Sequence, residues 1–124
     1  MLTFLNTLRR VGGKFEVQED GIRFYADGPL KAIHLETSVH PGFMTDWQSP
    51  FLLLLTQAEG MSVVHETVFE DRFGYVKALH DMGAEIALYD SCTGHRCRFA
   101  SSSYKLSAVI KGPIKLRSAD VTVP

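Results

Sequence analysis

Residues 4–17 read FLNTLRRVGGKFEV, and residues 75–88 read YVKALHDMGAEIAL. The two segments align without a gap, so their apolar residues and glycines fall at matching positions. Apolar residues spaced by three and four predict one buried face of a helix. Gly12 and Gly83 predict where each helix ends, because glycine adopts the left-handed cap conformation without steric cost. The apolar–polar alternation that follows has the period of a strand, so the chain repeats a helix–glycine–strand segment.

A second pair of similar motifs extends the repeat. Gly28-Pro29-Leu30-Lys31 resembles Gly112-Pro113-Ile114-Lys115, and strand-like residues follow each motif, at 32–39 and at 116–123. The offset between the copies grows from 71 to 84 positions, which means that the second copy carries an insertion. We place the insertion at about residues 90–103, whose serines and glycine predict a longer hairpin loop.

One more helix and one more strand lie between the two copies. The predicted buried stripe of this helix consists of Trp47, Phe51, Leu54 and Leu55. Thr45 and Asp46 are its N-cap candidates, and Glu59-Gly60 is its predicted end. Residues 61–69 then have the composition of a strand.

These elements predict the architecture of the chain. Their order from Ala32 to about Phe99 is β-α-β-α-β-β, which predicts an α/β (α+β) class. Residues 28–111 would form one full βαβαββ unit. Residues 1–27 would end a preceding unit, and residues 112–124 would supply the first strand of the next one.

The composition bounds the classes of partner. Hydrophobic residues make up 45% and charged residues 22% of the chain, as in a globular protein. The net charge of −1 argues against a nucleic-acid partner, and the longest apolar run, Phe51–Leu55, is far below the ~20 residues that cross a membrane. Arg9 and Arg10 follow the first apolar residues, which is the reverse of a secretory signal. We therefore expect a cytoplasmic protein whose Cys92 and Cys97 are free thiols.

Two motifs carry a resemblance to a known family. Residues 41–48 read PGFMTDWQ, and residues 65–73 read HETVFEDRF. They are similar to the Phe-x-Thr-Asp-x-Gln and Glu-Thr-Val-Phe-Glu-Asn-Arg-Phe motifs of the UDP-N-acetylglucosamine enolpyruvyl transferases. An Ala-Glu-Gly at residues 58–60 falls between them, as in that family. The shikimate branch of the superfamily carries Lys-Glu-Ser-Asp-Arg at the second place, so the chain resembles the sugar-nucleotide branch over nearly its whole length.

The resemblance implies a fold and a reaction. The fold is an inside-out α/β barrel of six βαβαββ units in two domains, of which this chain would be part of one domain. The reaction transfers the enolpyruvyl group of phosphoenolpyruvate to the 3-hydroxyl of UDP-N-acetylglucosamine for peptidoglycan synthesis, without a cofactor. Such chemistry needs a base at the sugar hydroxyl, an acid for the methylene carbon, and cations for phosphate and carboxylate.

The resemblance also assigns three residues to the substrate site. Asp46 matches the aspartate that contacts the sugar hydroxyl and is proposed to take its proton; the alternative is that it caps the following helix. Val68 matches a position whose main chain contacts the uridine, although an apolar strand residue is usually part of the core. Arg72 matches an arginine near the cleft, and the alternative is a surface salt bridge with Glu70 or Asp71.

Other parts of the implied site have no match in the chain. No segment resembles the family's acid loop or its cations for phosphoenolpyruvate, so we expect no turnover from the chain alone, and Cys92 and Cys97 are not assigned the acid's role. Cys92-x-x-His95-x-Cys97 offers three zinc ligands where a structural site has four, so no metal site is predicted. His40 is a minor site candidate because it lies near Asp46 in the sequence.

Two alternative functions remain from the sequence. The first is a non-catalytic UDP-sugar-binding or interaction module of the same fold. The second is a small RNA-binding α/β domain, although the balanced charge and the lack of a strand that combines aromatic and basic residues count against it. In each case, edge strands that a full domain would pair could lie open and favour self-association, for example as a dimer.

Overall fold

The computed structural model describes residues 2–39, 41–68, 72–89 and 107–122. The helices and strands, in chain order, are α1 (Leu2–Val11), β1 (Lys14–Gln18), β2 (Gly21–Tyr25), β3 (Leu30–Lys31), β4 (His34–Glu36), the 3-10 helix η1 (Thr45–Trp47), α2 (Gln48–Leu55), β5 (Ala58–His65), α3 (Val76–Asp81), β6 (Glu85–Tyr89) and β7 (Ser107–Gly112).

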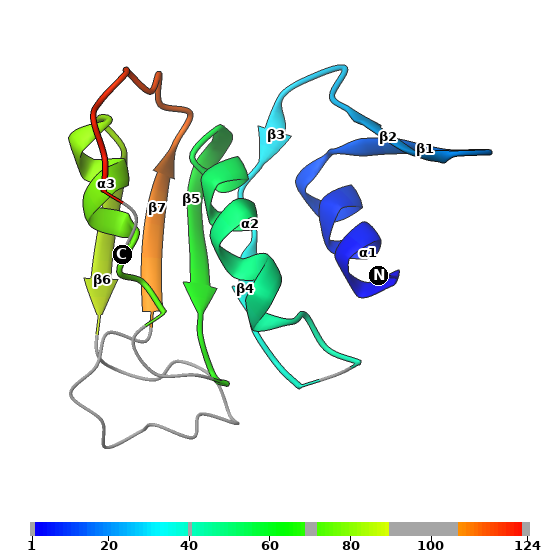
Figure 1. The fold of residues 1–124 in the computed structure, drawn as a ribbon, viewed down its shortest axis with the longest axis horizontal. Coiled ribbons are helices and arrows are strands. Elements are labelled where there is room, and N and C mark those ends of the chain that lie inside the picture. The colour runs from blue at the N-terminus through cyan, green and yellow to red at the C-terminus, as the bar shows by residue number, and fades with distance from the viewer. Residues whose placement is uncertain (1, 40, 69–71, 90–106, 123–124) are drawn as a thin grey trace.

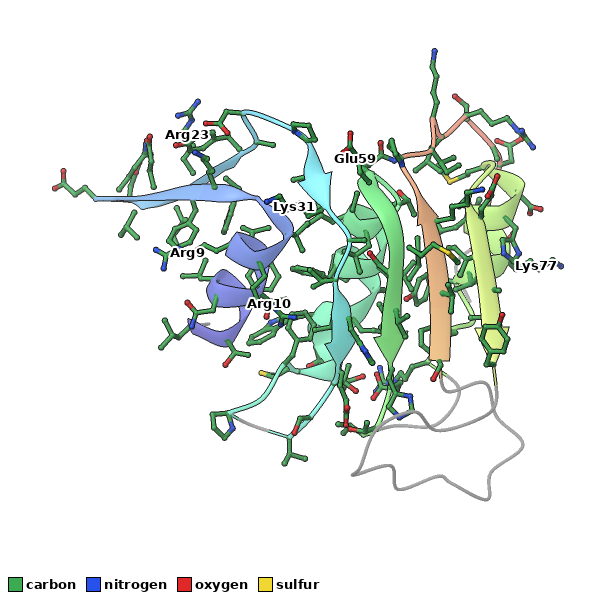
Figure 2. All side chains as sticks on the ribbon, turned by 180° about the vertical axis from the view of Figure 1, so that it is seen from behind. Arg9, Arg10, Arg23, Lys31, Glu59 and Lys77 are labelled. Carbon is green, nitrogen blue, oxygen red and sulfur yellow. The ribbon has the colours of Figure 1, made fainter. Side chains whose placement is uncertain are left out.

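The main sheet is built around β5. β3 and β4 pair with β5 in parallel, whereas β7 pairs antiparallel with both β5 and β6, so the sheet is mixed. Helices α2 and α3 lie on one face of this sheet (Figure 1), and the view from behind brings the strands in front of them (Figure 2). β1 and β2 form a separate antiparallel hairpin that extends away from the sheet, next to α1. This arrangement confirms the predicted α/β class.

The two repeated helices end in the same way. Gly12 has a φ of 97° and Gly83 a φ of 100°. In both copies, the residue after the glycine donates its N–H to the carbonyl five residues earlier, at 2.9 Å, and the glycine donates to the carbonyl three residues earlier. These two bonds form the Schellman motif, which satisfies carbonyls that a helix end leaves open. Both predicted helix ends are confirmed, and β1 and β6 follow them as expected.

α2 lies at the centre of the core. Phe51, Leu52 and Leu55 are at most 1% exposed, which extends the predicted stripe to Leu52. The reason is that α2 has more than one buried face: it packs on β5, and Phe4 of α1 also contacts the Phe51 ring, with centroids 5.7 Å apart. Trp47 and Leu54, the other predicted members, are partly buried against the core.

An aromatic cluster joins α1 to the segment that enters α2. It consists of Phe4, Phe43, Trp47 and Phe51. The contacting ring centroids lie 5.2–6.3 Å apart, and most pairs meet edge to face, the favoured geometry for aromatic rings. The cluster therefore holds the short η1 turn, which contains Asp46, against the core.

The predicted N-cap roles of Thr45 and Asp46 are wrong. Both residues lie inside η1, whose N-cap is Met44, and Trp47 occupies the N-cap position of α2. The Thr45 hydroxyl donates instead to the carboxylate of Glu66, at 2.7 Å. The Thr45 hydroxyl thus bonds to Glu66, which is distant in the sequence, and it does not cap the helix as the local pattern predicts.

The end of α2 also differs from the prediction. The helix stops at Leu55 and β5 begins at Ala58, so Glu59-Gly60 belongs to the strand. Gly60 has a φ of 110°, the left-handed conformation that a helix-ending glycine also adopts. A glycine in this conformation can end a helix or lie within a strand, and the sequence alone does not distinguish the two. The helix end predicted at Gly60 is wrong for this reason. β5 ends at His65, so residues 66–68 of the predicted strand lie outside it.

Of the strand predicted at residues 32–39, β4 covers His34–Glu36, whereas β3 (Leu30–Lys31) lies before the predicted range. Between them, the Ile33 N–H donates to the Ser62 hydroxyl oxygen at 3.2 Å. A side chain of β5 thus replaces a backbone acceptor at this point, which interrupts the regular ladder.

The strand predicted at residues 116–123 is wrong for its described part, because residues 113–122 belong to no strand. The Ile114 N–H donates to the Thr56 carbonyl at 3.0 Å, and the Arg117 N–H donates to the Met82 carbonyl at 2.9 Å. These carbonyls lie at the ends of α2 and α3. The backbone N–H groups of Ile114 and Arg117 therefore bond to the ends of two helices and not to a neighbouring strand.

The second strand of the later hairpin, β7, lies at residues 107–112 and not before Phe99 as predicted. The predicted insertion, with Cys92, His95 and Cys97, is outside the described residues, and so is His40. Among the helices that the structure describes, none combines the length and apolar character needed to cross a bilayer.

Candidate functional site

A cavity of about 220 Å³ lies where the start of α2 meets the segment before α3. Its lining residues are Thr45, Asp46, Gln48, Ser49, Arg72 and Tyr75. Asp46 and Arg72 are exposed, and they come from segments that are distant in the sequence. Two of the three predicted site residues therefore share one cavity, with a carboxylate and a guanidinium on its wall.

A buried carboxylate lies behind this cavity. Glu66 directly follows β5 and is 0% exposed. Its Oε1 accepts hydrogen bonds from the Thr45 hydroxyl at 2.7 Å and from the Gln48 amide at 3.1 Å. Its Oε2 accepts from the Thr37 hydroxyl at 2.8 Å and from the Val68 N–H at 2.9 Å. Because a buried charge is costly unless hydrogen bonds replace its hydration, four donors on one carboxylate are a strong stabilising arrangement.

The network extends to the cavity wall through Gln48. The Tyr75 hydroxyl donates to Gln48 Oε1, while Gln48 Nε2 donates to Glu66. These two bonds fix which end of the amide faces which partner, since only the NH₂ group can donate. On the other side, the Thr67 N–H donates to the Thr37 hydroxyl oxygen at 2.9 Å. The result is a continuous chain of polar contacts from Tyr75 to the end of β4.

Burial raises the pKa of the Tyr75 phenol above its ordinary value of 10.0, and the nearby charge of Glu66 raises it further. Both causes favour the neutral phenol, which is the form that can donate to Gln48. The unfolded chain would therefore lose this proton first as the pH rises above 10. The contribution of Tyr75 to stability is fully present below that pH and is lost at higher pH.

We predict that Tyr75→Phe flattens the alkaline loss of stability. The free energy of unfolding of the wild type should fall more steeply than that of the variant between about pH 9 and about pH 11, as the tyrosines of the unfolded chain ionise. At neutral pH the variant should be less stable by about 1 kcal/mol, the typical effect of one lost hydrogen bond. Urea denaturation at several pH values measures both quantities. Tyr89→Phe is the control because Tyr89 is 49% exposed; equal slopes for the two variants would contradict the prediction.

The third predicted site residue, Val68, is not among the residues that line the cavity. Its side chain is half-buried, and its N–H group is bonded to Glu66 within the chain. Glu66 thus connects Val68 to Thr45, the neighbour of Asp46, although the two segments are far apart in the sequence.

Sequence reasoning missed Glu66, Gln48 and Tyr75 as parts of this site. Glu66 and Gln48 were both inside the motifs that carried the resemblance, but no role was assigned to them. One available signal was the position of Glu66, since a glutamate directly after an apolar strand is unusual unless it is paired. The links from Thr37 and Tyr75 could not be found from spacing, because they depend on how the segments pack.

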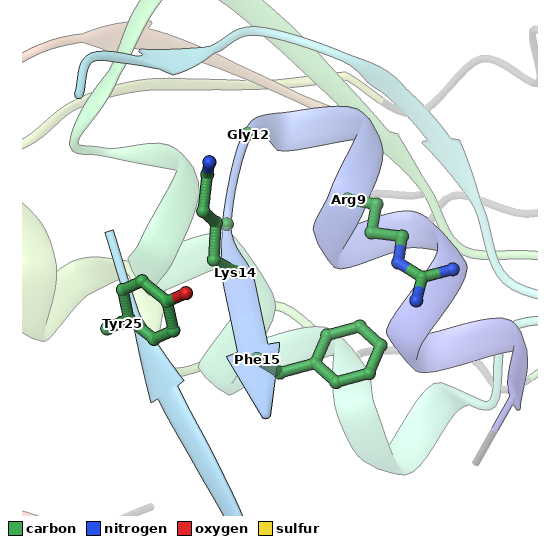
Figure 3. Close-up of a pocket in the computed structure, with 6 residues that line it drawn as sticks. Arg9, Gly12, Lys14, Phe15 and Tyr25 are labelled. Carbon is green, nitrogen blue, oxygen red and sulfur yellow. The ribbon is translucent and has the colours of Figure 1, made fainter. Parts of the chain in front are cut away.

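Two further cavities are lined mainly by other residues, although Tyr75 also lines the second of them. One, of about 330 Å³, is beside the end of α1 (Figure 3), where the Arg9 guanidinium lies 4.6 Å from the centre of the Phe15 ring. Lys14 Nζ, in the same cavity, lies 3.0 Å from the Asp27 carboxylate. Both cations are engaged within the chain, so we assign no anion site there.

The other cavity, of about 500 Å³, lies between α3 and the C-terminal segment and includes Lys77, Asp81 and Asp120. Figure 2 shows Lys77 at the end of the molecule opposite Arg9 and Arg23. Within the part of the chain that the structure describes, no three histidine, cysteine, aspartate or glutamate side chains are grouped so that they could hold a metal ion.

Comparison with known proteins shows which family the chain resembles. The model of the family described as EPSP synthase (3-phosphoshikimate 1-carboxyvinyltransferase) matches residues 1–119. The chain is 57% identical over 126 residues to the UDP-N-acetylglucosamine 1-carboxyvinyltransferase of Protochlamydia amoebophila, with 100% of this chain and 27% of that protein covered. It is 51% identical to the protein of the same name from Chlamydia trachomatis serovar D, with 100% and 28% covered. The chain thus spans about a quarter of the length of these curated relatives.

The fold is also found in a solved structure. The enolpyruvyl transferase NikO from Streptomyces tendae superimposes with a TM-score of 0.73 at 23% sequence identity. The match covers 90% of this chain and 22% of that one. The arrangement of helices and strands is therefore shared, while the low identity carries no statement about the site.

Proposed function

Because the chain belongs to the EPSP synthase family of enolpyruvyl transferases, we propose that it is part of a cytoplasmic UDP-N-acetylglucosamine 1-carboxyvinyltransferase. Such an enzyme transfers the enolpyruvyl group of phosphoenolpyruvate to the 3-hydroxyl of UDP-N-acetylglucosamine and serves peptidoglycan synthesis. The observation that supports this proposal most directly is the cavity that Asp46 and Arg72 line together.

In this proposal, Asp46 contacts the sugar hydroxyl and takes its proton. It lies in η1, immediately before α2. Its side chain is exposed on the cavity wall, where a base for a sugar hydroxyl would have to lie. Ser49, on the same wall, offers a hydroxyl for a further hydrogen bond to the sugar.

Arg72 and Val68 would bind other parts of the substrate. Arg72 brings a permanent positive charge to the cavity that contains Asp46, where it would attract an anionic substrate. Val68 would contact the uridine through its main chain. The acid and the cations that hold phosphoenolpyruvate would come from other parts of a longer protein, so binding is the appropriate test for this chain, for which we expect no turnover.

We predict that UDP-N-acetylglucosamine shifts the amide NMR signals of Asp46, Val68 and Arg72 in the isotope-labelled chain. Asp46→Asn should weaken the affinity about tenfold, as expected for the loss of a charge-assisted hydrogen bond. Asp20→Asn is the matched control because Asp20 is exposed in the turn between β1 and β2. An absence of shifts at millimolar ligand, or shifts confined to other segments, would exclude this binding site.

A further inference from the structure

The two oxygens of the Glu66 carboxylate accept hydrogen bonds from different parts of the chain. Oε1 accepts from the η1–α2 segment, through Thr45 and Gln48. Oε2 accepts from the end of β4 and from the chain beyond β5, through Thr37 and Val68. One rigid carboxylate therefore connects the segment that contains Asp46 with the segment that contains Val68.

The Glu66 carboxylate and its four donors have little freedom to move. The four donor–acceptor distances lie between 2.7 and 3.1 Å, and Thr37, Gln48 and Glu66 are each at most 1% exposed. Since water is excluded around Thr37, Gln48 and Glu66, a bond lost among these three cannot be replaced by hydration, and the donor would have to move or remain unsatisfied. A shift of the carboxylate would therefore displace both segments together.

We propose that Glu66 is a positioning residue that sets the distance between Asp46 and the Val68 main chain. This inference rests on the proposed function, in which these two groups contact different ends of one UDP-sugar. A substrate that is bound at both ends requires a fixed spacing between its contacts, because a displacement of about 1 Å at a site is already costly for binding and catalysis. Glu66 acts through Thr45 and through its own bond to Val68, and it does not itself line the cavity.

A carboxylate suits this task better than an amide. In Glu66→Gln, one of the two oxygens becomes an NH₂ group that faces two donors. Whichever orientation the amide takes, one segment loses its acceptor while the other keeps it. The substitution thus retains size and shape but uncouples the two segments.

The first measurement is amide hydrogen exchange in the ligand-free chain. Thr45→Val should raise the exchange rate of the Gln48 N–H, which closes the η1 turn on Thr45, by about tenfold, the effect of one ordinary hydrogen bond. It should leave the Val68 N–H within about twofold. Thr37→Val should show the reverse pattern, because Thr37 accepts from Thr67 and donates to Oε2. Glu66→Gln should raise exchange on the side whose acceptor oxygen the amide nitrogen replaces and leave the other side within about twofold. Equal changes at the Gln48 and Val68 N–H groups in all three variants would overturn the inference.

The second measurement is the affinity for UDP-N-acetylglucosamine. Glu66→Gln, Thr45→Val and Thr37→Val should each weaken binding about tenfold or more. The control is Thr7→Val, because Thr7 is 5% exposed and donates to a carbonyl within α1, outside the network. The network variants are compared with Thr7→Val at equal thermal stability. If they lose more affinity than Thr7→Val does, the effect comes from positioning and not from a general structural role.

The outcomes distinguish this inference from the proposed function. If the wild type binds the UDP-sugar and Glu66→Gln binds equally well, the positioning role is overturned while the function stands. If Glu66→Gln does not fold, wild-type affinity in both threonine variants overturns the role in the same way. If the wild type does not bind, the proposed function fails, and the exchange rates still decide whether each oxygen of the Glu66 carboxylate holds its own part of the chain.

Discussion

Phe51→Ala is expected to lower the free energy of unfolding by about 3–5 kcal/mol, the range measured for a buried aromatic residue that leaves a cavity. Phe51 is 1% exposed. Its ring centroid lies 5.2 Å from that of Phe43 and 5.7 Å from that of Phe4. The substitution removes contacts with α1 and with the segment before η1 at once, so neighbouring side chains cannot collapse into the space without separating these elements.

Urea denaturation followed by circular dichroism measures this effect. Trp47 is the single tryptophan of the chain and belongs to the aromatic cluster, so its fluorescence reports the local packing in parallel. Leu53→Ala is the matched control on the same helix, because Leu53 is 43% exposed and should lose about 1 kcal/mol or less. Similar losses for the two variants would show that the aromatic cluster is not the centre of the core.

Gly112→Ala should be the most damaging of the single-methyl additions considered for this chain. A Cβ at this position would lie 2.5 Å from the Ala58 carbonyl oxygen and 2.6 Å from the Thr56 carbonyl oxygen. Both atoms belong to the backbone, and Gly112 pairs with Gly60 in the β5–β7 ladder. Relief of the clash would therefore shift the ladder or the end of α2, and we expect a loss of about 3 kcal/mol, at the upper end of ordinary overpacking.

The repeated motif supplies the control for this prediction. Gly28 also precedes a proline in a Gly-Pro-x-Lys sequence, but nothing lies within 4 Å of a Cβ built there. Gly28→Ala should change the free energy of unfolding by no more than about 0.5 kcal/mol, as is usual for an exposed position. If the two glycine variants were equally stable, the close approach of Gly112 to the end of α2 would be wrong.

Local signals in the sequence predicted the parts of the fold that depend on local conformation. Both helix–glycine–strand segments formed as expected because the apolar period and the glycine act within one or two turns. The same reasoning failed at Gly60 and at residues 113–122, where the conformation is set by partners elsewhere in the chain. The resemblance to the enolpyruvyl transferases is confirmed by the family match over residues 1–119.

The candidate site was predicted less completely than the fold. The motifs led to Asp46 and Arg72, which line one cavity. They did not reveal that Thr45 and Thr37 donate to opposite oxygens of Glu66. This contact joins three segments, and no spacing within any single segment encodes it.

Two antiparallel pairings of the chain, β1–β2 and β5–β7, differ in the order in which they can form. β1 and β2 are joined by the two-residue turn at Glu19 and Asp20, whereas β5 pairs residues 60–65 with residues 107–112. Local pairings form quickly, while distant ones wait for a long loop to close. During synthesis on the ribosome, the β1–β2 hairpin can therefore form early, but β5 stays without β7 until residue 112 has emerged. Glu66 directly follows β5, so the strand that leads to this carboxylate would gain its β7 partner only at that late stage of translation.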